Sequence, residues 1–332
     1  MIAPPARLEL ALAPTPILKL DRLSRRLGVE VHVKRDDLTG LLESGNKVRK
    51  LEFLVGEALQ QGADTLITCG PPDSNGCRAV AAVAARLGLR AVLAIRGERP
   101  AADDGNLLLG RLLGAETRYH PELERGPEPA DIVVEALAAE VRARGARPYV
   151  IPESGAGELG ALGYVECAVE LSEQIHHGAP RFDTVVITSG SGGSHAGLLM
   201  GKQLAGLPGE IVSVPVTAPA ERVREAIVRT VGAAIRRFGF AIEVPKAIHL
   251  LDGYQGAAGP TDQELAILVE LAREEGLMLD PVYTARGFRG LVETLARDPR
   301  ALGQRVCFIH TGGLYSVFPL RDHLRRLLDR AQ

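Results

Sequence analysis

Apolar residues follow two alternating spacings along this chain. Runs typical of buried strands occur at residues 65–69, 91–95 and 183–188, and each is followed by a stretch whose apolar residues recur three and four positions apart, as on one face of a helix. This repeated order of strand and helix predicts largely parallel sheets with helices on both faces, an α/β fold.

The elements expected from this pattern fall into two lobes. Strands are expected at residues 29–33, 65–69, 91–95, 117–120, 148–151, 183–188, 211–216 and 306–310. Helices are expected at residues 46–61, 76–88, 106–113, 130–144, 160–175, 220–238 and 262–276, and after the loop at 189–197. Residues 51–154 are predicted to form one lobe of ordinary domain size, and the small residues 155–157 begin the second.

Composition narrows the class of protein. A chain of 332 residues is long enough for two hydrophobic cores, and its net charge of −2 offers no field for a nucleic acid or an acidic membrane surface. No apolar run reaches the length of a membrane span and the N-terminus lacks a secretion signal, so a cytoplasmic protein is expected. The cysteines Cys69, Cys77, Cys167 and Cys307 have no metal-ligand spacing, so we expect buried reduced thiols and no metal site.

Lys47 is the first candidate for chemistry. It follows Gly45 and Asn46 at the start of a predicted helix, with Arg49 and Lys50 close by. The positive end of a helix dipole disfavours cations, so this placement suits a lysine whose amine must be uncharged and nucleophilic, because a neighbouring cation and a dry pocket both lower a lysine pKa. A solvated basic helix face is the alternative that these residues alone leave open.

A glycine-rich loop at residues 189–197 is the second candidate. It lies between a predicted strand and a predicted helix, where free backbone N–H groups and a helix dipole favour an anion. The dinucleotide-binding fingerprint fails, because the sixth position counted from Gly190 is His195. A single phosphate fits better, held by Gly190, Ser191, Gly192, Gly193 and Ser194, although a glycine-rich helix start without a ligand remains open. A reactive lysine and a phosphate site together indicate pyridoxal 5'-phosphate.

Six motifs carry a resemblance to a known family. They are the stretch from Ser44 to Glu52, Asp73-Ser74-Asn75, Gly160-Ala161-Leu162-Gly163-Tyr164, the loop at 189–197, Leu279-Asp280-Pro281-Val282-Tyr283-Thr284, and Phe308-Ile309-His310-Thr311-Gly312-Gly313. In this order they resemble the D-cysteine desulfhydrase and 1-aminocyclopropane-1-carboxylate deaminase family of pyridoxal phosphate enzymes. The resemblance implies the tryptophan-synthase-β-like fold, called fold type II, and a homodimer. It also implies that residues 1–50 join residues 155–332 in a large cofactor-binding domain, with residues 51–154 inserted as a small domain.

The resemblance also assigns roles to site residues. Lys47 would hold the cofactor covalently and later move the substrate proton. Asn75 would bond the ring hydroxyl of the cofactor, and Ser74 with the neighbouring main chain, including Gly76, would receive the substrate carboxylate. Tyr283 would stand beside the substrate as acid, base or nucleophile. Without the resemblance, a helix N-cap is the simpler interpretation of Ser74, an Asx turn of Asn75 and a core tyrosine of Tyr283.

Two neutral residues separate the branches of this family. Cyclopropane deaminases carry an acid at the position of Thr284, facing the ring nitrogen, and usually lack a threonine at the position of Thr311. If these two hydroxyls face the ring nitrogen, the ring is a weaker electron sink, which suffices to expel sulfide but less readily opens a carbon ring. The resemblance therefore favours a lyase that eliminates a β leaving group from a small amino acid such as D-cysteine.

The loop at residues 70–76, which the resemblance makes the substrate loop, departs from the family pattern. Asp73 and Gly76 replace the usual glutamine and histidine, and an ionised Asp73 would repel a substrate carboxylate. Asp73 must therefore turn away, be protonated, or meet a cationic or hydroxylated substrate group. Ala156 and Tyr315 also differ from the usual residues. Three alternatives stay open: a cyclopropane deaminase, a deaminase or β-replacement enzyme for an unusual amino acid, and a non-catalytic pyridoxal phosphate-binding protein. His195, His249 and His310 are expected to pack or to brace loops.

Overall fold

Two sheets organise the computed structural model, which describes residues 5–42, 45–125, 130–256 and 259–330. Glu43 and Ser44, the latter the first residue of the lysine motif, lie outside these ranges. The first sheet has the order β1 (Ile17–Lys19), β2 (Glu30–Lys34), β10 (Arg305–Ile309), β7 (Thr184–Ser189), β8 (Glu210–Pro215) and β9 (His249–Leu250). The second has the order β5 (Glu116–His120), β4 (Arg90–Arg96), β3 (Thr65–Gly70) and β6 (Pro148–Val150).

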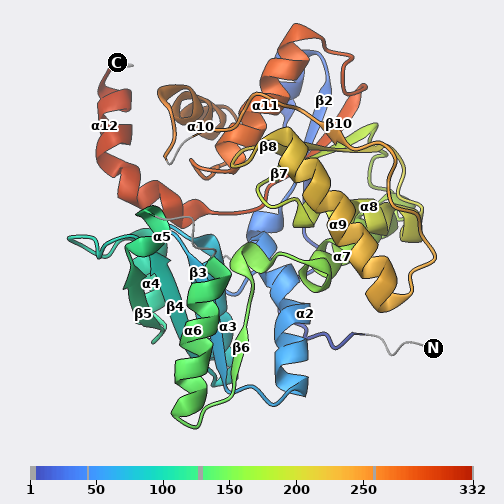
Figure 1. The fold of residues 1–332 in the computed structure, drawn as a ribbon. Helices are drawn as coiled ribbons and strands as arrows, with labels where there is room; N and C mark the ends of the chain where they lie inside the picture. Colours follow the sequence, from blue (N-terminus) through green and yellow to red (C-terminus); the bar gives the residue numbers. More distant parts are fainter. Residues whose placement is uncertain (1–4, 43–44, 126–129, 257–258, 331–332) are drawn as a thin grey trace.

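Almost every strand pair is parallel. Among the strand pairs of the described residues in the six-stranded sheet, only the pairing of β1 with β2, at the edge, is antiparallel. All three pairings in the four-stranded sheet are parallel. Parallel strands need a crossover connection, and helices supply it, so both sheets are covered by helices as Figure 1 shows. The predicted α/β class with largely parallel sheets is confirmed.

The helices occupy the remaining regular segments. They are α1 (Asp21–Leu27), α2 (Asn46–Gln60), α3 (Asn75–Leu87), α4 (Gly105–Leu112), α5 (Glu122–Arg125), α6 (Ala130–Ala143), α7 (Glu158–His176), α8 (Gly193–Ala205), α9 (Ala220–Phe238), α10 (Asp262–Glu275), α11 (Thr284–Arg297) and α12 (Arg321–Arg330). Three 3₁₀ helices, η1 (Asp36–Leu38), η2 (Glu153–Gly155) and η3 (Leu314–Leu320), complete the set. Each expected strand and helix is present within two residues of its predicted ends, with α8 beginning inside the glycine loop. The sequence pattern did not predict β1, β9, α1, α5, α11 or α12.

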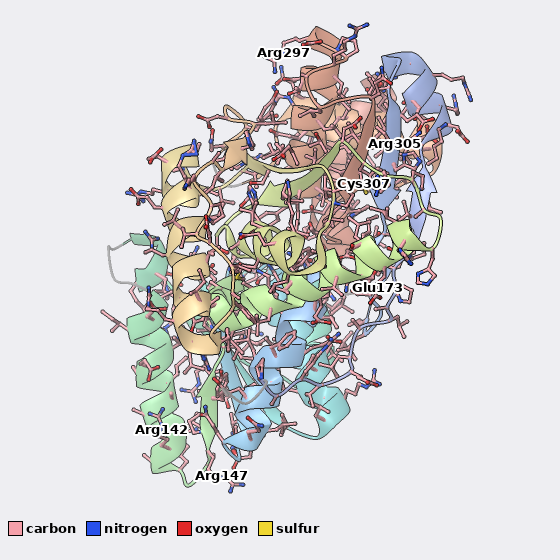
Figure 2. The ribbon with its side chains drawn as sticks, turned by 90° about the vertical axis from the view of Figure 1, so that its right-hand side faces the viewer. Arg142, Arg147, Glu173, Arg297, Arg305 and Cys307 are labelled. Atoms are coloured by element: carbon pink, nitrogen blue, oxygen red, sulfur yellow. The ribbon has the colours of Figure 1, made fainter. Side chains whose placement is uncertain are left out.

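Apolar burial follows the two sheets. One cluster packs β2, β7, β8 and β10 against α10 and α11, and another packs β3 and β4 against α6. All four cysteines are buried and free, as expected. Figure 2 shows Cys307 within the fold, whereas Arg142 and Arg147 lie at the outer end of the four-stranded unit. The division into domains at residues 50/51 and 154/155 stays a prediction.

Helix α7 ties the start of α2 to the start of α8. It packs on both helices, and at Gly163 a Cβ atom would lie 2.3 Å from the carbonyl oxygen of Arg49, so the close approach of α2 and α7 requires glycine there. Arg49 also pairs with Asp36 at 2.9 Å and with Glu170 of α7 at 2.8 Å, all with little exposure. The N-terminus of α2 is thereby fixed relative to that of α8.

Within the described ranges, no helix has the length and apolar character to cross a membrane. The same ranges contain no group of histidine, cysteine and acidic side chains arranged to hold a metal ion.

Candidate active site

One pocket gathers residues from both sheets. It is lined by Asn46, Lys47, Lys50, Pro71, Asp73, Ser74, Asn75, Gly76, Glu153, Ser154, Thr188, Ser189, Gly190, Ser191, Gly192, Gly193, Ser194, Asp280, Tyr283, Thr311 and Gly312. Parallel strands direct their carboxyl ends to one edge, and β3, β7 and β10 each deliver a loop here. The structure thus brings together all the predicted site residues except Thr284.

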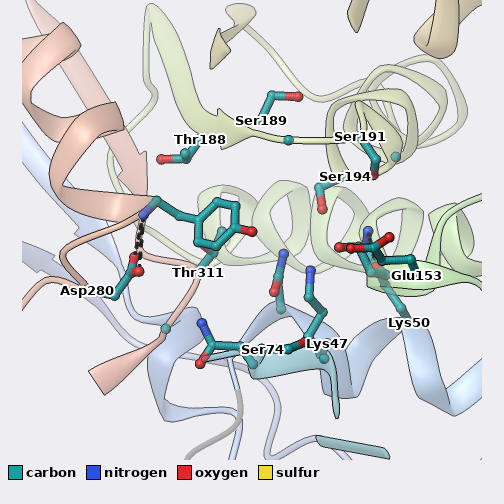
Figure 3. A pocket seen from close by; sticks show the side chains of 18 of the residues that line it. Lys47, Lys50, Ser74, Glu153, Thr188, Ser189, Ser191, Ser194, Asp280 and Thr311 are labelled. Atoms are coloured by element: carbon teal, nitrogen blue, oxygen red, sulfur yellow. Dashed lines mark hydrogen bonds between the residues drawn. The ribbon is translucent and has the colours of Figure 1, made fainter. Parts of the chain in front are cut away.

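Lys47 lies in the first turn of α2, as predicted. Its helix starts against the end of β10, because Asn46 donates its backbone N–H to the Thr311 carbonyl at 3.0 Å and a Cβ at Gly45 would lie 2.1 Å from that same oxygen. Burial lowers the pKa of Lys47 to about 8, against an opposing effect of the Glu153 and Asp280 carboxylates. The amine therefore sheds its proton more readily than an exposed lysine does. Figure 3 shows it pointing into the pocket.

The glycine loop forms the opposite wall of the pocket. In Figure 3, Ser191 and Ser194 face Lys47 and Ser74 across the pocket. Helix α8 starts at Gly193 with no side-chain cap, so its first backbone N–H groups are free to bind an anion. Ser189, at the entrance to the loop, has a buried hydroxyl oxygen without a partner among the described residues. These features fit a phosphate group.

Lys50 adds a cation that the sequence analysis did not assign. A Cβ at Gly193 would lie 3.4 Å from its ammonium nitrogen, which also donates to the Ser154 carbonyl at 3.3 Å. Burial and then the charge of Lys47 hold the Lys50 pKa well below its usual value. An anion at the start of α8 would offset both the burial and the repulsion. Spacing gives the signal in retrospect, because Lys47 and Lys50 are three residues apart on one face of α2.

The substrate loop at residues 73–76 starts α3. Ser74 is the N-cap residue, and its hydroxyl accepts the backbone N–H of Cys77 at 3.1 Å, so the simpler N-cap interpretation holds alongside its place in the pocket. Asn75 and Gly76 lie in the first turn of α3. The helix N-terminus therefore faces the pocket, where its dipole favours a carboxylate.

Asn106 holds this loop in place and was missed by the sequence analysis. Its amide nitrogen donates to the Asp73 carbonyl at 2.7 Å, to the Asn75 side-chain oxygen at 3.0 Å and to the Ser316 hydroxyl at 3.2 Å. Its own oxygen accepts from Arg78 at 2.7 Å. These contacts join α4, the substrate loop and η3. They leave the Asn75 amide nitrogen as the group available to the pocket, near Gly313.

Asp280 is the most enclosed acid of the pocket. Its carboxylate accepts backbone N–H groups of Val282, Tyr283 and Thr284 and the Thr284 hydroxyl at 2.8 Å. Burial raises its pKa, although these hydrogen bonds oppose the rise. Figure 3 shows Asp280 and Thr311 at one end of the pocket.

The two threonines predicted to face a ring nitrogen are placed differently. Thr311 lines the pocket, whereas Thr284 is fully buried behind Asp280 and is not part of the lining. A contact between Thr284 and a ring nitrogen stays a prediction, and it would require the hydroxyl to leave Asp280. Tyr283 lines the pocket, and burial raises its pKa, with the Asp73, Asp280 and Glu153 carboxylates adding to the effect.

The histidines brace the fold around the pocket. His310 contacts the Met278 carbonyl at 2.8 Å through Nε2 and accepts the Gly312 N–H at 3.1 Å through Nδ1, which fixes the loop after β10. Burial lowers the pKa of His195 to about 3, and its Nδ1 contacts the Ser213 hydroxyl at 2.7 Å. His195 is therefore a neutral packing residue.

Comparison with known proteins agrees with this geometry. Residues 8–312 match the family described as pyridoxal-phosphate dependent enzyme. A protein of Pyrococcus abyssi, provisionally named a 1-aminocyclopropane-1-carboxylate deaminase, is 42% identical over 95% of this chain and 93% of its own length. A D-cysteine desulfhydrase of Klebsiella pneumoniae is 39% identical over 96% of this chain and 97% of its own length. The crystal structure of a protein described as a homologue of 1-aminocyclopropane-1-carboxylate (ACC) deaminase superposes with a TM-score of 0.87 at 36% sequence identity. The superposition covers 97% of this chain and 96% of that one. The expected resemblance and fold type II are confirmed.

Proposed function

The chain belongs to the pyridoxal-phosphate dependent enzymes, and from that premise we propose that it is a lyase removing a β leaving group from a small amino acid such as D-cysteine. The products would be an α-keto acid, ammonia and the leaving group. The observation that carries this proposal is the pairing, in one pocket, of a lysine with a lowered pKa and an uncapped helix start across from it.

The pocket residues would divide the work of binding the cofactor. Lys47 would hold it covalently, the loop residues 190–194 with Lys50 would bind its phosphate, and Asn75 would donate to its ring hydroxyl. Thr311 lines the pocket where the ring nitrogen could lie. When bound, pyridoxal phosphate supplies an electron sink for negative charge at the substrate α-carbon.

The chain would supply the proton transfers and the substrate contacts. The Lys47 amine would take the proton from the α-carbon, since its lowered pKa leaves about a tenth of it unprotonated at pH 7, against less than about a thousandth for an ordinary lysine. The start of α3, with Ser74 and Gly76, would receive the substrate carboxylate. Tyr283 would remain protonated because its pKa is raised, and so would act as a proton donor toward the leaving group.

A comparison of three substrates tests the reaction class. Keto-acid release would be measured with D-cysteine, β-chloro-D-alanine and 1-aminocyclopropane-1-carboxylate at equal concentration. We expect the first two to react faster, because the family resemblance puts an acid at position 284 in the cyclopropane deaminases, whereas this chain has threonine there and at position 311. If the cyclopropane reacts fastest, the elimination assignment is wrong and the deaminase named among the relatives is the better one. Turnover of any amino acid excludes a non-catalytic cofactor carrier.

A β-replacement reaction is the second candidate. It would begin with the same loss of the leaving group and differ only in a second substrate, so product analysis with an added thiol separates the two reactions. A homodimer is also proposed on the strength of the family resemblance, and size-exclusion chromatography with light scattering tests the oligomeric state. The cytoplasmic location expected from the sequence stays a proposal.

A further inference from the structure

The charges that line the pocket do not balance. Its charged side chains are Lys47, Lys50, Asp73, Glu153 and Asp280, which make two cations and three acids. A bound amino acid brings an additional carboxylate, and the described residues that line the pocket include no arginine to receive it. The question is which of the three acids has a partner within the protein.

Two of the acids have partners. Asp280 accepts the backbone N–H groups and the hydroxyl described above, and so can remain ionised while enclosed. Glu153 pairs with Arg96 at 3.0 Å. Neither carboxylate is left to be satisfied by a ligand.

Asp73 is the acid without such a partner. Within the described ranges its carboxylate makes no ion pair and no hydrogen bond to another side chain, while its carbonyl accepts a hydrogen bond from the Asn106 amide. Burial and the charge of Asp280 raise the pKa of Asp73, and this rise is opposed by a hydrogen bond from its own main chain and by no cation among the described residues. A ligand cation would supply one.

The two lysines are not available to Asp73 once the cofactor is bound. Lys50 reaches the Ser154 carbonyl and the loop that would hold the phosphate, and Lys47 would be bonded to the cofactor. Gly76 lies next to Lys47, because a Cβ at this position would be in ordinary contact with its neighbours, 3.9 Å from the Lys47 Cε and 3.5 Å from the Ser74 hydroxyl. The histidine that the family resemblance puts at this position would add a side chain there that this chain lacks.

We propose that Asp73 selects amino acids whose β-substituent is positively charged, so that the preferred substrates are β-amino-α-amino acids. The proposal rests on the elimination reaction above and names its leaving group. The Lys47 amine takes the α-proton, the double bond forms between the α- and β-carbons, and the bond from the β-carbon to the ammonium nitrogen breaks. The electron pair leaves with nitrogen as neutral ammonia, so no further acid is consumed. Water then releases the α-nitrogen, and one diamino acid gives one keto acid and two ammonia molecules. Asp73 favours the protonated β-amine, which is the form able to leave.

The test compares charged and neutral substrates in matched variants. Holoenzyme would be assayed with both enantiomers of 2,3-diaminopropionate and of cysteine, in wild type, Asp73→Asn and Asp73→Glu. We expect wild type to prefer the diamino acid in kcat/KM by at least about 10-fold. In Asp73→Asn, kcat/KM for the diamino acid should fall about 10- to 100-fold relative to kcat/KM for cysteine, as expected for one charge-assisted contact. Asp73→Glu should keep the preference for the cation.

A binding measurement separates recognition from turnover. Calorimetry of 2,3-diaminopropionate with cofactor-loaded Lys47→Ala protein should show affinity that falls with added salt and falls again when Asp73→Asn is introduced. Circular dichroism would verify that each variant is folded. If Asp73→Asn does not fold, the comparison of wild type with Asp73→Glu on charged and neutral substrates is used instead.

The outcomes distinguish this inference from the proposed function. If wild type prefers neutral substrates, or if Asp73→Asn lowers activity equally on both classes, the inference is wrong and the lyase assignment stands. If the protein takes up no pyridoxal phosphate and releases keto acid from no amino acid, both are wrong.

Discussion

Replacement of Asn106 by alanine should disturb both stability and cofactor binding, although Asn106 does not line the pocket. Asn106 is 2% exposed and accepts from Arg78 while donating to Asp73, Asn75 and Ser316. The contact with Asn75 matters most, because it orients that amide. With its oxygen bonded to Asn106, Asn75 offers its nitrogen to the pocket as a donor, which is what a ring hydroxylate of the cofactor requires.

The magnitude follows from the partners left behind. The variant removes the acceptor of the Arg78 Nε and the donor to two oxygens in the substrate loop. A buried polar group that loses its partner costs about 1–3 kcal/mol, but the loop oxygens border a pocket that water can enter. We therefore expect a loss of about 2–4 kcal/mol in the free energy of unfolding. Free rotation of the Asn75 amide should weaken cofactor binding by about 10-fold, or about 1.4 kcal/mol.

A second variant separates the two effects. Asn106→Asp keeps the size and the acceptor for Arg78, but it cannot donate to Asn75, whose amide should then turn its oxygen to the pocket. Urea denaturation should show that Asn106→Asp is more stable than Asn106→Ala. Titration with pyridoxal phosphate, followed by absorbance, should show that it binds the cofactor no better. Wild-type cofactor affinity in Asn106→Asp would refute the reasoning.

Three further predictions concern Lys47 and its helix. After borohydride reduction of the yellow holoprotein, peptide mapping should find the cofactor attached to Lys47, and an adduct on another lysine would contradict the site. The Lys47→Ala variant should lose turnover but still bind the cofactor weakly. The pKa of Lys47 lies near 8 in the folded chain against 10.5 for an unperturbed lysine, so the unfolded chain binds more protons in that window. The stability of the cofactor-free protein should therefore rise with pH from about 8 to about 10.5, by at most about 3 kcal/mol, and urea denaturation of Lys47→Met should lack this part of the rise. Gly163→Ala should lower the free energy of unfolding by about 1–3 kcal/mol and displace α2, because the added Cβ would lie 2.3 Å from the Arg49 carbonyl oxygen. If the urea midpoint and the Lys47 pKa are both unchanged, the two helices can separate at no cost and this reasoning is wrong.

The periodic parts of the fold were predictable, and the short or motif-bearing parts were not. β1 and β9 have three and two residues, too few for alternation to be visible. Helix α11 carries a clear signal in Phe288, Leu291 and Leu295, all fully buried. It was missed because the sequence before it was interpreted as a motif around Tyr283, although the residue after that tyrosine already begins the helix.

Three residues in or behind the pocket could not be assigned from the sequence. Asn106 is 31 residues from Asn75 and 210 from Ser316, and neither spacing belongs to a local pattern. Glu153 enters the pocket through η2, where Ser154 adopts φ of 62°, a conformation that no sequence rule indicates for serine. Lys50 was visible as a cation but had no role until α7 and α8 brought the glycine loop against it.

The lowered pKa of Lys47 was anticipated, and its cause was only half anticipated. The sequence suggested a neighbouring cation and a dry pocket, and burial is indeed the largest effect on the Lys47 pKa. The charges that act on Lys47 are acids, Glu153 and Asp280, which raise its pKa and limit the shift. The repulsion between cations acts instead on Lys50, whose pKa is lowered by burial and by Lys47. A phosphate beside Lys50 would therefore keep Lys50 charged, and this charge in turn would favour the neutral form of Lys47. Cofactor binding and lysine activation would thus be coupled through a residue three positions along the same helix.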